Sequence, residues 1–212
     1  DYDNEGEDAK TCKVVLLGES GVGKTSIISR FINDNFEEDI VTTTGASYVG
    51  KNMMFSDYNQ VLNFEIWDTA GQEKYNSMGA SFYRNTETCV LVFDLTSRES
   101  FDNIESWRNN FMSSLNLSEE EKFPFVLVGN KSDLEDKIQV NDDVIKDYCI
   151  QHNNISFFKT SAKEKTNLEE VFSEVAGLAL KRYKSEDNIS VLSDNKFVTV
   201  KVEPKKKKCC GK

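Results

Sequence analysis

One glycine-rich stretch near the N-terminus carries the clearest chemistry in the chain. It reads Gly18-Glu19-Ser20-Gly21-Val22-Gly23-Lys24-Thr25 and fits the phosphate-loop pattern G-x-x-x-x-G-K-[ST]. Glycines allow consecutive backbone N–H groups to turn inward around a polyphosphate. Lys24 can place a full positive charge on the β- and γ-phosphates, and the Thr25 hydroxyl can ligate Mg²⁺. The stretch therefore predicts binding of a nucleoside triphosphate.

The residues on either side of this loop form the elements that such a site requires. Residues 12–17 are an apolar run with the composition of a buried strand. After the loop, apolar residues recur at helical spacing, at Ile27, Ile28, Phe31 and Ile32. A helix that begins there directs the positive end of its dipole at the phosphates. The alternative, a glycine-rich turn with a chance lysine, explains neither flanking element.

Beyond this unit, short apolar runs alternate with helical patterns along the chain. The pattern predicts strands at 46–55, 61–67, 88–93, 123–128 and 155–158. It predicts helices over 101–115, around 144–149 and over 168–183. Because only a short polar turn separates the first two of those strands, we expect them to pair as an antiparallel hairpin. The predicted fold is α/β, a single P-loop domain whose mostly parallel six-stranded sheet has one antiparallel edge hairpin and helices on both faces.

Length and charge divide the 212 residues into one folded domain and two appendages. Residues 1–9 are acidic and lack apolar periodicity, so we expect a disordered N-terminus before a domain at 10–184. Over 185–212 polar residues dominate, and seven Lys accompany four Asp or Glu, which predicts a flexible basic tail. The net charge of −10 argues against nucleic acid as a partner of the body.

Cysteine usage and hydropathy indicate an intracellular protein without a membrane span. Cys12, Cys89 and Cys149 lie in or beside apolar runs and are expected to be reduced core residues. No apolar run approaches the about 20 residues that a spanning helix needs. The acidic N-terminus is the reverse of a secretory signal. His152 is the only histidine, so a transition-metal site has little support, and we expect His152 on the solvated surface.

Five polar loops at predicted strand ends carry the remaining signal. After the phosphate loop come Thr42-Thr43-Thr44-Gly45, Asp68-Thr69-Ala70-Gly71-Gln72, Asn130-Lys131-Ser132-Asp133 and Ser161-Ala162-Lys163. Ligands of such sheets bind at the carboxyl ends of the strands. In this order the loops resemble the Ras superfamily of small GTPases, and in detail the Rab family, over roughly residues 10–183. The run at 123–130 resembles the late-endosomal branch of that family.

The resemblance implies a G domain that binds GTP or GDP together with Mg²⁺. Thr25 and Thr43 would ligate the metal through their hydroxyls, and Asp68 would act through a bound water. The N–H of Gly71 would reach the γ-phosphate, and Gln72 would orient the attacking water, with Lys24 as the second catalytic residue. The phosphates would lie along Ser20, Gly21, Val22, Gly23, Lys24, Thr25 and Ser26.

The same resemblance implies a guanine pocket. Asp133 would select guanine because an acceptor-only carboxylate matches the adjacent N–H donors of that base, and Phe36 would pack edge-on against it. The rest of the pocket would come from Asn130, Lys131, Ser161, Ala162 and Lys163. Plainer alternatives remain for single residues. Asp68 and Asp133 could each cap a turn, and Phe36 could be a core residue.

A Rab-like chain would be a slow GTPase switch that recruits effectors to membranes in intracellular vesicle trafficking. Ser20 stands where an arginine in cis would be needed, so a GTPase-activating protein would supply that charge. Loss of the γ-phosphate would release the loops that hold Thr43 and Gly71. Effectors would contact the aromatic residues Tyr48, Trp67 and Phe82, although Trp67 could equally be an ordinary core residue. Further implied partners are an exchange factor and a GDP-dissociation inhibitor.

The C-terminal end combines basic residues with a pair of cysteines. Four lysines at 205–208 precede Cys209 and Cys210, and the final Lys212 makes a poor C-a-a-X signal. A Rab-type double-cysteine end would take a geranylgeranyl group on both cysteines, and two lipids anchor stably where one does not. This implies the prenylation machinery as a partner and a place on the cytoplasmic face of intracellular membranes, endosomes included, in exchange with the cytosol. A solvated basic tail and a redox-active vicinal pair are the alternatives.

Two rival functions share part of the pattern. A P-loop nucleotide kinase has the first motif, but it would also need an arginine-rich lid and adenine selectivity, and this chain has neither signal. A GTP-binding scaffold with little turnover would keep the nucleotide site, and Gln72 argues against it. The sequence therefore favours a GTP hydrolase.

Overall fold

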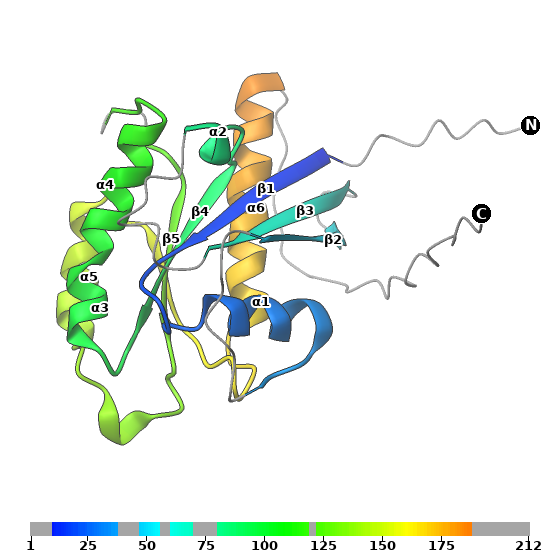
Figure 1. Cartoon of the computed structure of the whole chain (residues 1–212). Coiled ribbons are helices and arrows are strands. Elements are labelled where there is room, and N and C mark those ends of the chain that lie inside the picture. The colour runs from blue at the N-terminus through cyan, green and yellow to red at the C-terminus, as the bar shows by residue number, and fades with distance from the viewer. Residues whose placement is uncertain (1–9, 38–46, 56–59, 70–79, 119–121, 188–212) are drawn as a thin grey trace, which may run out of the picture.

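A computed structural model describes residues 10–37, 47–55, 60–69, 80–118 and 122–187. Six strands form one sheet in the order β2-β3-β1-β4-β5-β6 (Figure 1). They are β1 (Lys10–Leu17), β2 (Ser47–Phe55), β3 (Gln60–Asp68), β4 (Thr88–Asp94), β5 (Phe125–Asn130) and β6 (Ser156–Lys159). β2 pairs antiparallel with β3, and every other pairing is parallel. The predicted sheet with one antiparallel edge hairpin is confirmed.

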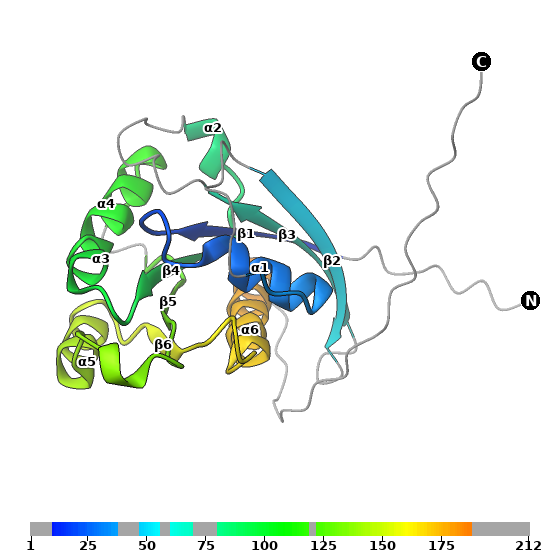
Figure 2. The same cartoon turned by 60° about the horizontal axis from the view of Figure 1, so that its bottom comes forward.

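Helices cover both faces of the sheet, as predicted. They are α1 (Lys24–Asn33), α2 (Ala80–Tyr83), α3 (Arg98–Asp102), α4 (Ile104–Ser114), α5 (Asp142–Gln151) and α6 (Leu168–Asp187), with a short 3₁₀ turn η3 (Glu135–Lys137). Figures 1 and 2 show α1 and α6 on one face and α3, α4 and α5 on the other. The chain therefore has three layers, with the sheet in the middle.

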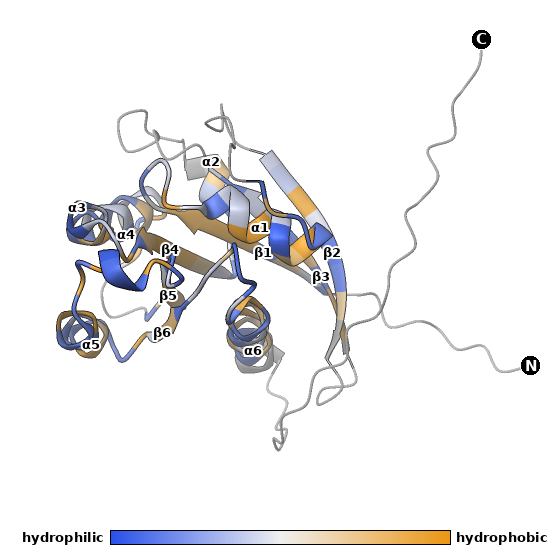
Figure 3. Ribbon diagram, turned by 90° about the horizontal axis from the view of Figure 1, so that it is seen from below, coloured by the Kyte–Doolittle hydropathy of each residue, from blue (hydrophilic) through white to orange (hydrophobic). Residues whose placement is uncertain are grey.

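The central strands are apolar on both sides because each side meets a helix layer. In β1, Val14 and Leu16 pack with residues of α1 and α6, whereas Val15 and Leu17 pack with residues of α3, α4 and α5. All four side chains are completely buried, and burial of each contributes about 1.5–3 kcal/mol. Alternate residues of a strand face opposite ways, so such a strand reads as one continuous apolar run. In Figure 3 the central strands are coloured largely as hydrophobic and lie between the two helix layers.

One predicted helix proves to be two. Instead of a single helix over 101–115, α3 begins at Arg98, where the Ser97 hydroxyl accepts a hydrogen bond from the Ser100 N–H at 3.3 Å. Asn103 ends α3 and also caps α4. The polar first turn of α3 has no apolar period that could have revealed it in the sequence.

Two element boundaries also differ from the prediction. β5 begins at Phe125 rather than at residue 123, because Pro124 has no N–H to give to a ladder; its carbonyl instead accepts from the Cys89 N–H at 3.1 Å. α6 continues to Asp187, past the expected helix end near Tyr183. Its last turn is polar, so the apolar periodicity fades before the helix does.

The cysteines of the described chain are core residues. Cys12, Cys89 and Cys149 are buried free thiols, which confirms the prediction. Burial raises the pKa of the Cys12 and Cys89 thiols, so the reactive thiolate is disfavoured there. None of the described helices combines the length and the hydrophobicity that crossing a bilayer requires.

Candidate functional site

The phosphate loop turns between β1 and α1 at the carboxyl edge of the sheet. Two of its glycines are required by close approaches of neighbouring strands. A Cβ on Gly18 would lie 2.0 Å from the Val92 carbonyl oxygen, and one on Gly23 would lie 2.2 Å from the Asn130 amide nitrogen. Gly23 also has a φ of 101°, which disfavours any other residue. The motif therefore has a packing reason as well as a ligand-binding one.

Lys24 is buried at the start of α1 and reaches back under the loop. Its side chain is 4% exposed, and its Nζ donates to the carbonyl oxygens of Gly18 at 2.7 Å and Glu19 at 2.9 Å. A buried ammonium group requires such partners, because burial without them costs several kcal/mol. The structure thus holds a full positive charge inside the predicted phosphate site.

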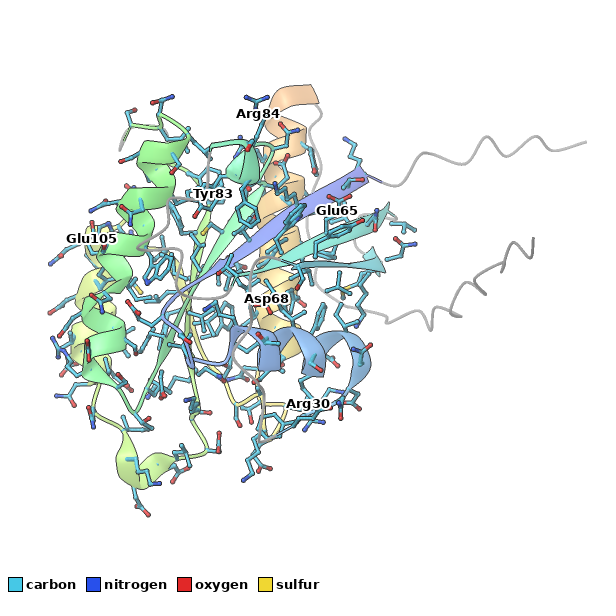
Figure 4. The ribbon with its side chains drawn as sticks, viewed as in Figure 1. Arg30, Glu65, Asp68, Tyr83, Arg84 and Glu105 are labelled. Carbon is cyan, nitrogen blue, oxygen red and sulfur yellow. The ribbon has the colours of Figure 1, made fainter. Side chains whose placement is uncertain are left out.

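The predicted metal residues Thr25 and Asp68 meet directly. Thr25 lies in the first turn of α1 and Asp68 ends β3 beside it (Figure 4), and the Thr25 Oγ1 donates to the Asp68 Oδ2 at 2.6 Å. The next residue, Thr69, donates its hydroxyl to the Leu16 carbonyl at 2.9 Å and ties this corner to β1. Asp68 therefore contacts a helix that is distant in the sequence, whereas the turn-capping alternative requires only a partner within a few residues.

Asn130, the last residue of β5, joins two of the predicted loops. Its Nδ2 donates to the Val22 carbonyl of the phosphate loop at 2.9 Å. Its Oδ1 accepts from the Ala162 N–H at 3.2 Å and from the Thr160 hydroxyl at 3.3 Å. We call Ser161-Ala162-Lys163 the base loop. The buried Asn130 side chain thus links the phosphate loop to the base loop.

Asp133 and Lys131 are also held by side chains. The Ser161 hydroxyl of the base loop donates to the Asp133 Oδ1 at 2.6 Å. Lys131, whose φ is 65°, places its Nζ 2.6 Å from the Asp94 Oδ2 at the end of β4. Asp94 had no assigned role in the sequence, although it stands at a strand end like the other site residues. The structure therefore brings Asp133 and the base loop together and adds Asp94.

Comparison with known proteins identifies the family that this chain resembles in sequence. The Ras family model matches residues 13–181. Ras-related protein Rab-7b of Paramecium octaurelia is 38% identical, over 93% of this chain and 96% of its own length. The GTPase ypt7 of Schizosaccharomyces pombe is 42% identical over 86% and 88%, and RABG3f of Arabidopsis thaliana is 43% identical over 82% and 85%. The chain belongs to the Ras family, as a Rab GTPase of the Rab7 branch.

Membership of the Ras family decides between the functions that the sequence left open. Rab GTPases hydrolyse GTP and act in vesicle trafficking, so this chain is a GTP hydrolase that binds GTP and GDP and works with regulators and effectors. The predictions of a Rab GTPase and of the late-endosomal branch are confirmed. Neither the nucleotide kinase nor the scaffold without turnover finds support among the relatives.

The three aromatic residues predicted to contact effectors lie side by side in this Rab GTPase. Tyr48 of β2 stacks on Trp67 of β3 with ring centroids 5.1 Å apart, and Phe82 of α2 meets Trp67 edge-on at 5.1 Å. Tyr48 is 63% exposed, whereas Trp67 and Phe82 are half-buried and also pack on the core. Trp67 therefore fits both of the interpretations that the sequence left open.

Lys13 lies against two of these rings, those of Trp67 and Phe82. Its Nζ is 4.5 Å from the centroid of the Trp67 ring and donates to the carbonyl oxygens of Phe82 and, at 3.0 Å, Arg84. Burial lowers the pKa of Lys13, while the charge of Glu65 acts in the opposite direction. Figure 4 labels Glu65, which lies on β3, and Arg84, which directly follows α2. Lys13 thus ties β1 to the chain that follows α2.

Arg30 contacts the base loop and had no assigned role in the sequence. It lies in the last turn of α1 and hydrogen-bonds to the carbonyls of Ala162 and Lys163 in the base loop. Its guanidinium carbon is 5.8 Å from the centroid of the Phe36 ring. Phe36 is half-buried and packs against the core under α1 and α6, so both of its earlier interpretations survive.

Part of the predicted site lies outside the described residues. This applies to Thr43, Gly71 and Gln72 among the nucleotide residues, and to Cys209 and Cys210 in the tail. Their roles stay predictions.

The expectation for His152 was wrong. Its ring packs on Tyr148 with centroids 4.3 Å apart, and its Nε2 lies 3.1 Å from the Glu105 Oε2. The Tyr148 hydroxyl donates to the same carboxylate oxygen at 3.0 Å. His152 caps the end of α5, as its place in a polar helix end suggested, but its side chain turns toward α4 rather than into solvent.

Proposed function

We propose that GTP or GDP lies along the carboxyl edge of the sheet, with its phosphates in the phosphate loop and its guanine between Asp133 and the base loop. One observation supports this most strongly: the Asn130 side chain bonds both to Val22 at 2.9 Å and to Ala162 at 3.2 Å. The two ends of one ligand need binding groups at a fixed separation, and a buried amide bonded to both loops provides it.

Mg²⁺ fits beside the phosphate loop. The Thr25 hydroxyl and the Asp68 carboxylate are already in contact at 2.6 Å, and Thr43 would add a second hydroxyl. These are hard oxygen donors of the kind that Mg²⁺ prefers. The ion would offset negative charge on the β- and γ-phosphate oxygens, and the buried Lys24 ammonium would contribute to the same effect.

Hydrolysis in the proposed site is slow alone and accelerated by an activating protein. Gln72 orients the attacking water, because an amide can both donate and accept a hydrogen bond. Ser20 and Gly21 line an open hollow of about 270 Å³, which the acidic residues Glu19 and Glu99 also line. Such a wall favours entry of a cationic side chain, and an arginine from the partner would stabilise the charge of the transition state.

Effectors and regulators would recognise the aromatic surface formed by Tyr48, Trp67 and Phe82. The exposure of Tyr48, 63%, supports this, because large aromatic side chains at a surface are typical interface anchors. The exchange factor and the GDP-dissociation inhibitor would act on the same protein as it alternates between its GTP-bound and GDP-bound states.

The tail would anchor the protein to the cytoplasmic face of endosomal membranes, in exchange with the cytosol, after the prenylation machinery modifies Cys209 and Cys210. The Rab7-named relatives support this location. Changing both cysteines to serine should release the tagged full chain into the cytosol, and Cys209→Ser alone should leave weak, reversible binding, because one lipid anchors only marginally. Membrane binding that persists in the double variant would contradict the anchor.

Base preference tests the proposed nucleotide site. Asp133→Asn should weaken GTP binding about a hundredfold or more and favour xanthosine triphosphate, because the amide offers a donor where xanthine carries a carbonyl. Asp136→Asn, an exposed change in η3, is the matched control and should keep the guanine preference. Competition titrations with GTP, xanthosine triphosphate and ATP measure this. An unchanged preference in Asp133→Asn, or ATP that competes as well as GTP, would refute the assignment.

A further inference from the structure

The last turn of α1 carries an arginine that holds a loop far away in the sequence. The Nε of Arg30 donates to the Ala162 carbonyl at 3.0 Å, and its Nη2 donates to the Lys163 carbonyl at 2.9 Å. The side chain is only 19% exposed. One planar guanidinium group therefore fixes two consecutive carbonyls, which a flexible ammonium group could not do in the same geometry.

These bonds complete the restraint of the base loop. The Ala162 N–H is already taken by the Asn130 Oδ1 at 3.2 Å, and the Ser161 hydroxyl is bonded to Asp133 at 2.6 Å. With Arg30 on the carbonyls, the peptide groups on both sides of Ala162 are restrained. A loop held in this way presents its remaining polar groups in one orientation.

The same guanidinium group also restrains the other side of the proposed pocket. It lies over the Phe36 ring at 5.8 Å, and its Nη1 donates to the Asp34 carbonyl at 2.9 Å. Asp34 caps α1 with a left-handed φ of 55° and bonds to Lys165 at 3.1 Å. The hydrogen bond and the charge of Lys165, and to a smaller extent the charge of Arg30, lower the pKa of the Asp34 carboxyl. Arg30 thus connects the chain that carries Phe36 to the base loop.

We propose that Arg30 is a positioning residue of the guanine pocket: it sets the base loop against Phe36 and thereby slows release of the nucleotide, without touching the nucleotide. This rests on the proposed placement of guanine at Asp133 and the base loop. Within the described residues, the guanidinium group donates to the carbonyls of Ala162, Lys163 and Asp34 and not to the phosphate loop, Thr25 or Asp68, so the chemical step on bound GTP is expected to be independent of Arg30.

The test compares Arg30→Gln and Arg30→Lys in the full chain. Arg98→Gln is the matched control, because Arg98 also pairs with a carboxylate four residues on, Asp102, but lies on α3. Release of fluorescently labelled GDP should be about tenfold faster in Arg30→Gln, the effect of losing roughly one charged hydrogen bond. Arg30→Lys keeps the charge without the fork and should lie between wild type and Arg30→Gln. Arg98→Gln should release GDP at the wild-type rate.

Single-turnover hydrolysis of prebound GTP distinguishes positioning from general damage. It should stay within twofold of wild type in both Arg30 variants, whereas a merely destabilised fold would speed GDP release and slow hydrolysis together. The proposal is overturned if GDP release in Arg30→Gln and Arg30→Lys stays within twofold of wild type, or if Arg98→Gln matches them. Asp133→Asn separates the two failures: if it changes the base preference while the Arg30 variants release GDP normally, only the role of Arg30 is wrong.

Discussion

Two clusters of polar side chains connect distant parts of this Rab GTPase, and they are built differently. At the carboxyl edge of the sheet, the neutral amide of Asn130 bonds to backbone groups of the phosphate loop and the base loop. Between α4 and α5, the carboxylate of Glu105 accepts from the Tyr148 hydroxyl, lies 3.1 Å from the His152 ring nitrogen and faces the buried Arg108 at 3.7 Å. The first cluster joins loops, and the second joins helices.

We call the residue at the centre of each cluster, Asn130 or Glu105, its hub. The chemistry of each hub fits what it connects. An amide donates and accepts at the same time and carries no charge, so its geometry does not depend on pH. This suits loops that must present a ligand site in one arrangement. A carboxylate only accepts and gathers cations and hydroxyl groups, which suits two helices that only need to stay together. We therefore expect the Asn130 cluster to affect nucleotide binding and the Glu105 cluster to affect stability alone.

Removal of the neutral hub should have the largest effect. Asn130→Ala leaves the Val22 carbonyl and the Ala162 N–H buried without their partner, and each such group costs about 1–3 kcal/mol. We expect the free energy of unfolding to fall by about 2–4 kcal/mol and GTP affinity to fall about a hundredfold or more. Urea unfolding and nucleotide titration measure the two quantities.

Asn110→Ala is the control for this change, because Asn110 is an exposed residue of α4. It should leave both quantities unchanged. If Asn130→Ala lost stability but bound GTP as tightly as wild type, the link between the phosphate loop and the base loop would not matter for the ligand. The expectation that the Asn130 cluster affects nucleotide binding would then be wrong.

Neutralising the charged hub should have a smaller effect of a different kind. Glu105→Gln keeps an acceptor for the Tyr148 hydroxyl but removes the negative charge that faces Arg108, which is 4% exposed. Because Glu105 itself is 43% exposed, solvent screens part of the interaction, and we expect a loss of about 1–2 kcal/mol in the free energy of unfolding.

GDP release by Glu105→Gln should stay within twofold of wild type, since the contacts of Glu105 described above are with α4 and α5 and not with the phosphate loop or the base loop. Glu170→Gln, at an exposed position of α6, is the matched control for stability. Faster GDP release in Glu105→Gln would show that the two clusters are coupled.

The sheet and the ligand loops were predictable from sequence because their signals are local. Val90 and Leu91 face opposite helix layers and are both buried, so β4 reads as an uninterrupted apolar run. The phosphate loop is recognisable because its glycines and lysine are adjacent in the chain, and the strand and helix beside it follow immediately. The structure places Lys24 and Thr25 at the start of α1, as the order of strand, loop and helix predicts.

The side-chain contacts between distant segments could not be predicted, because their signals are not local in the sequence. Arg30 and Ala162 are 132 residues apart, and a single arginine in an amphipathic helix normally indicates only a solvated face. His152 had the same weakness, since its partner Glu105 lies on another helix. Asp94 stood at a strand end, which was the one signal that could have marked it.

The pH dependence of stability gives the smallest but most specific test of the charged hub. Burial, and then the charge and hydrogen bond of Glu105, raise the pKa of Tyr148 above its ordinary value of about 10. Because the folded state resists ionisation of this hydroxyl, its contribution is fully present below about pH 10 and is lost as the pH rises further, where the unfolded chain ionises first. The wild-type free energy of unfolding should therefore fall above pH 10.

Tyr148→Phe isolates this contribution. Near pH 8 it should be less stable than wild type by about 0.5–1.5 kcal/mol, the value of one hydrogen bond. Above pH 10 the two curves should converge, because only wild type has the ionising group, while the buried thiols of Cys12 and Cys89 are common to both proteins. Urea unfolding at pH 8, 9, 10 and 11 measures the difference, with Tyr48→Phe on the exposed surface as the control. A constant difference across this range would mean that Glu105 and burial do not hold the Tyr148 proton, and the hub would be reduced to packing between α4 and α5.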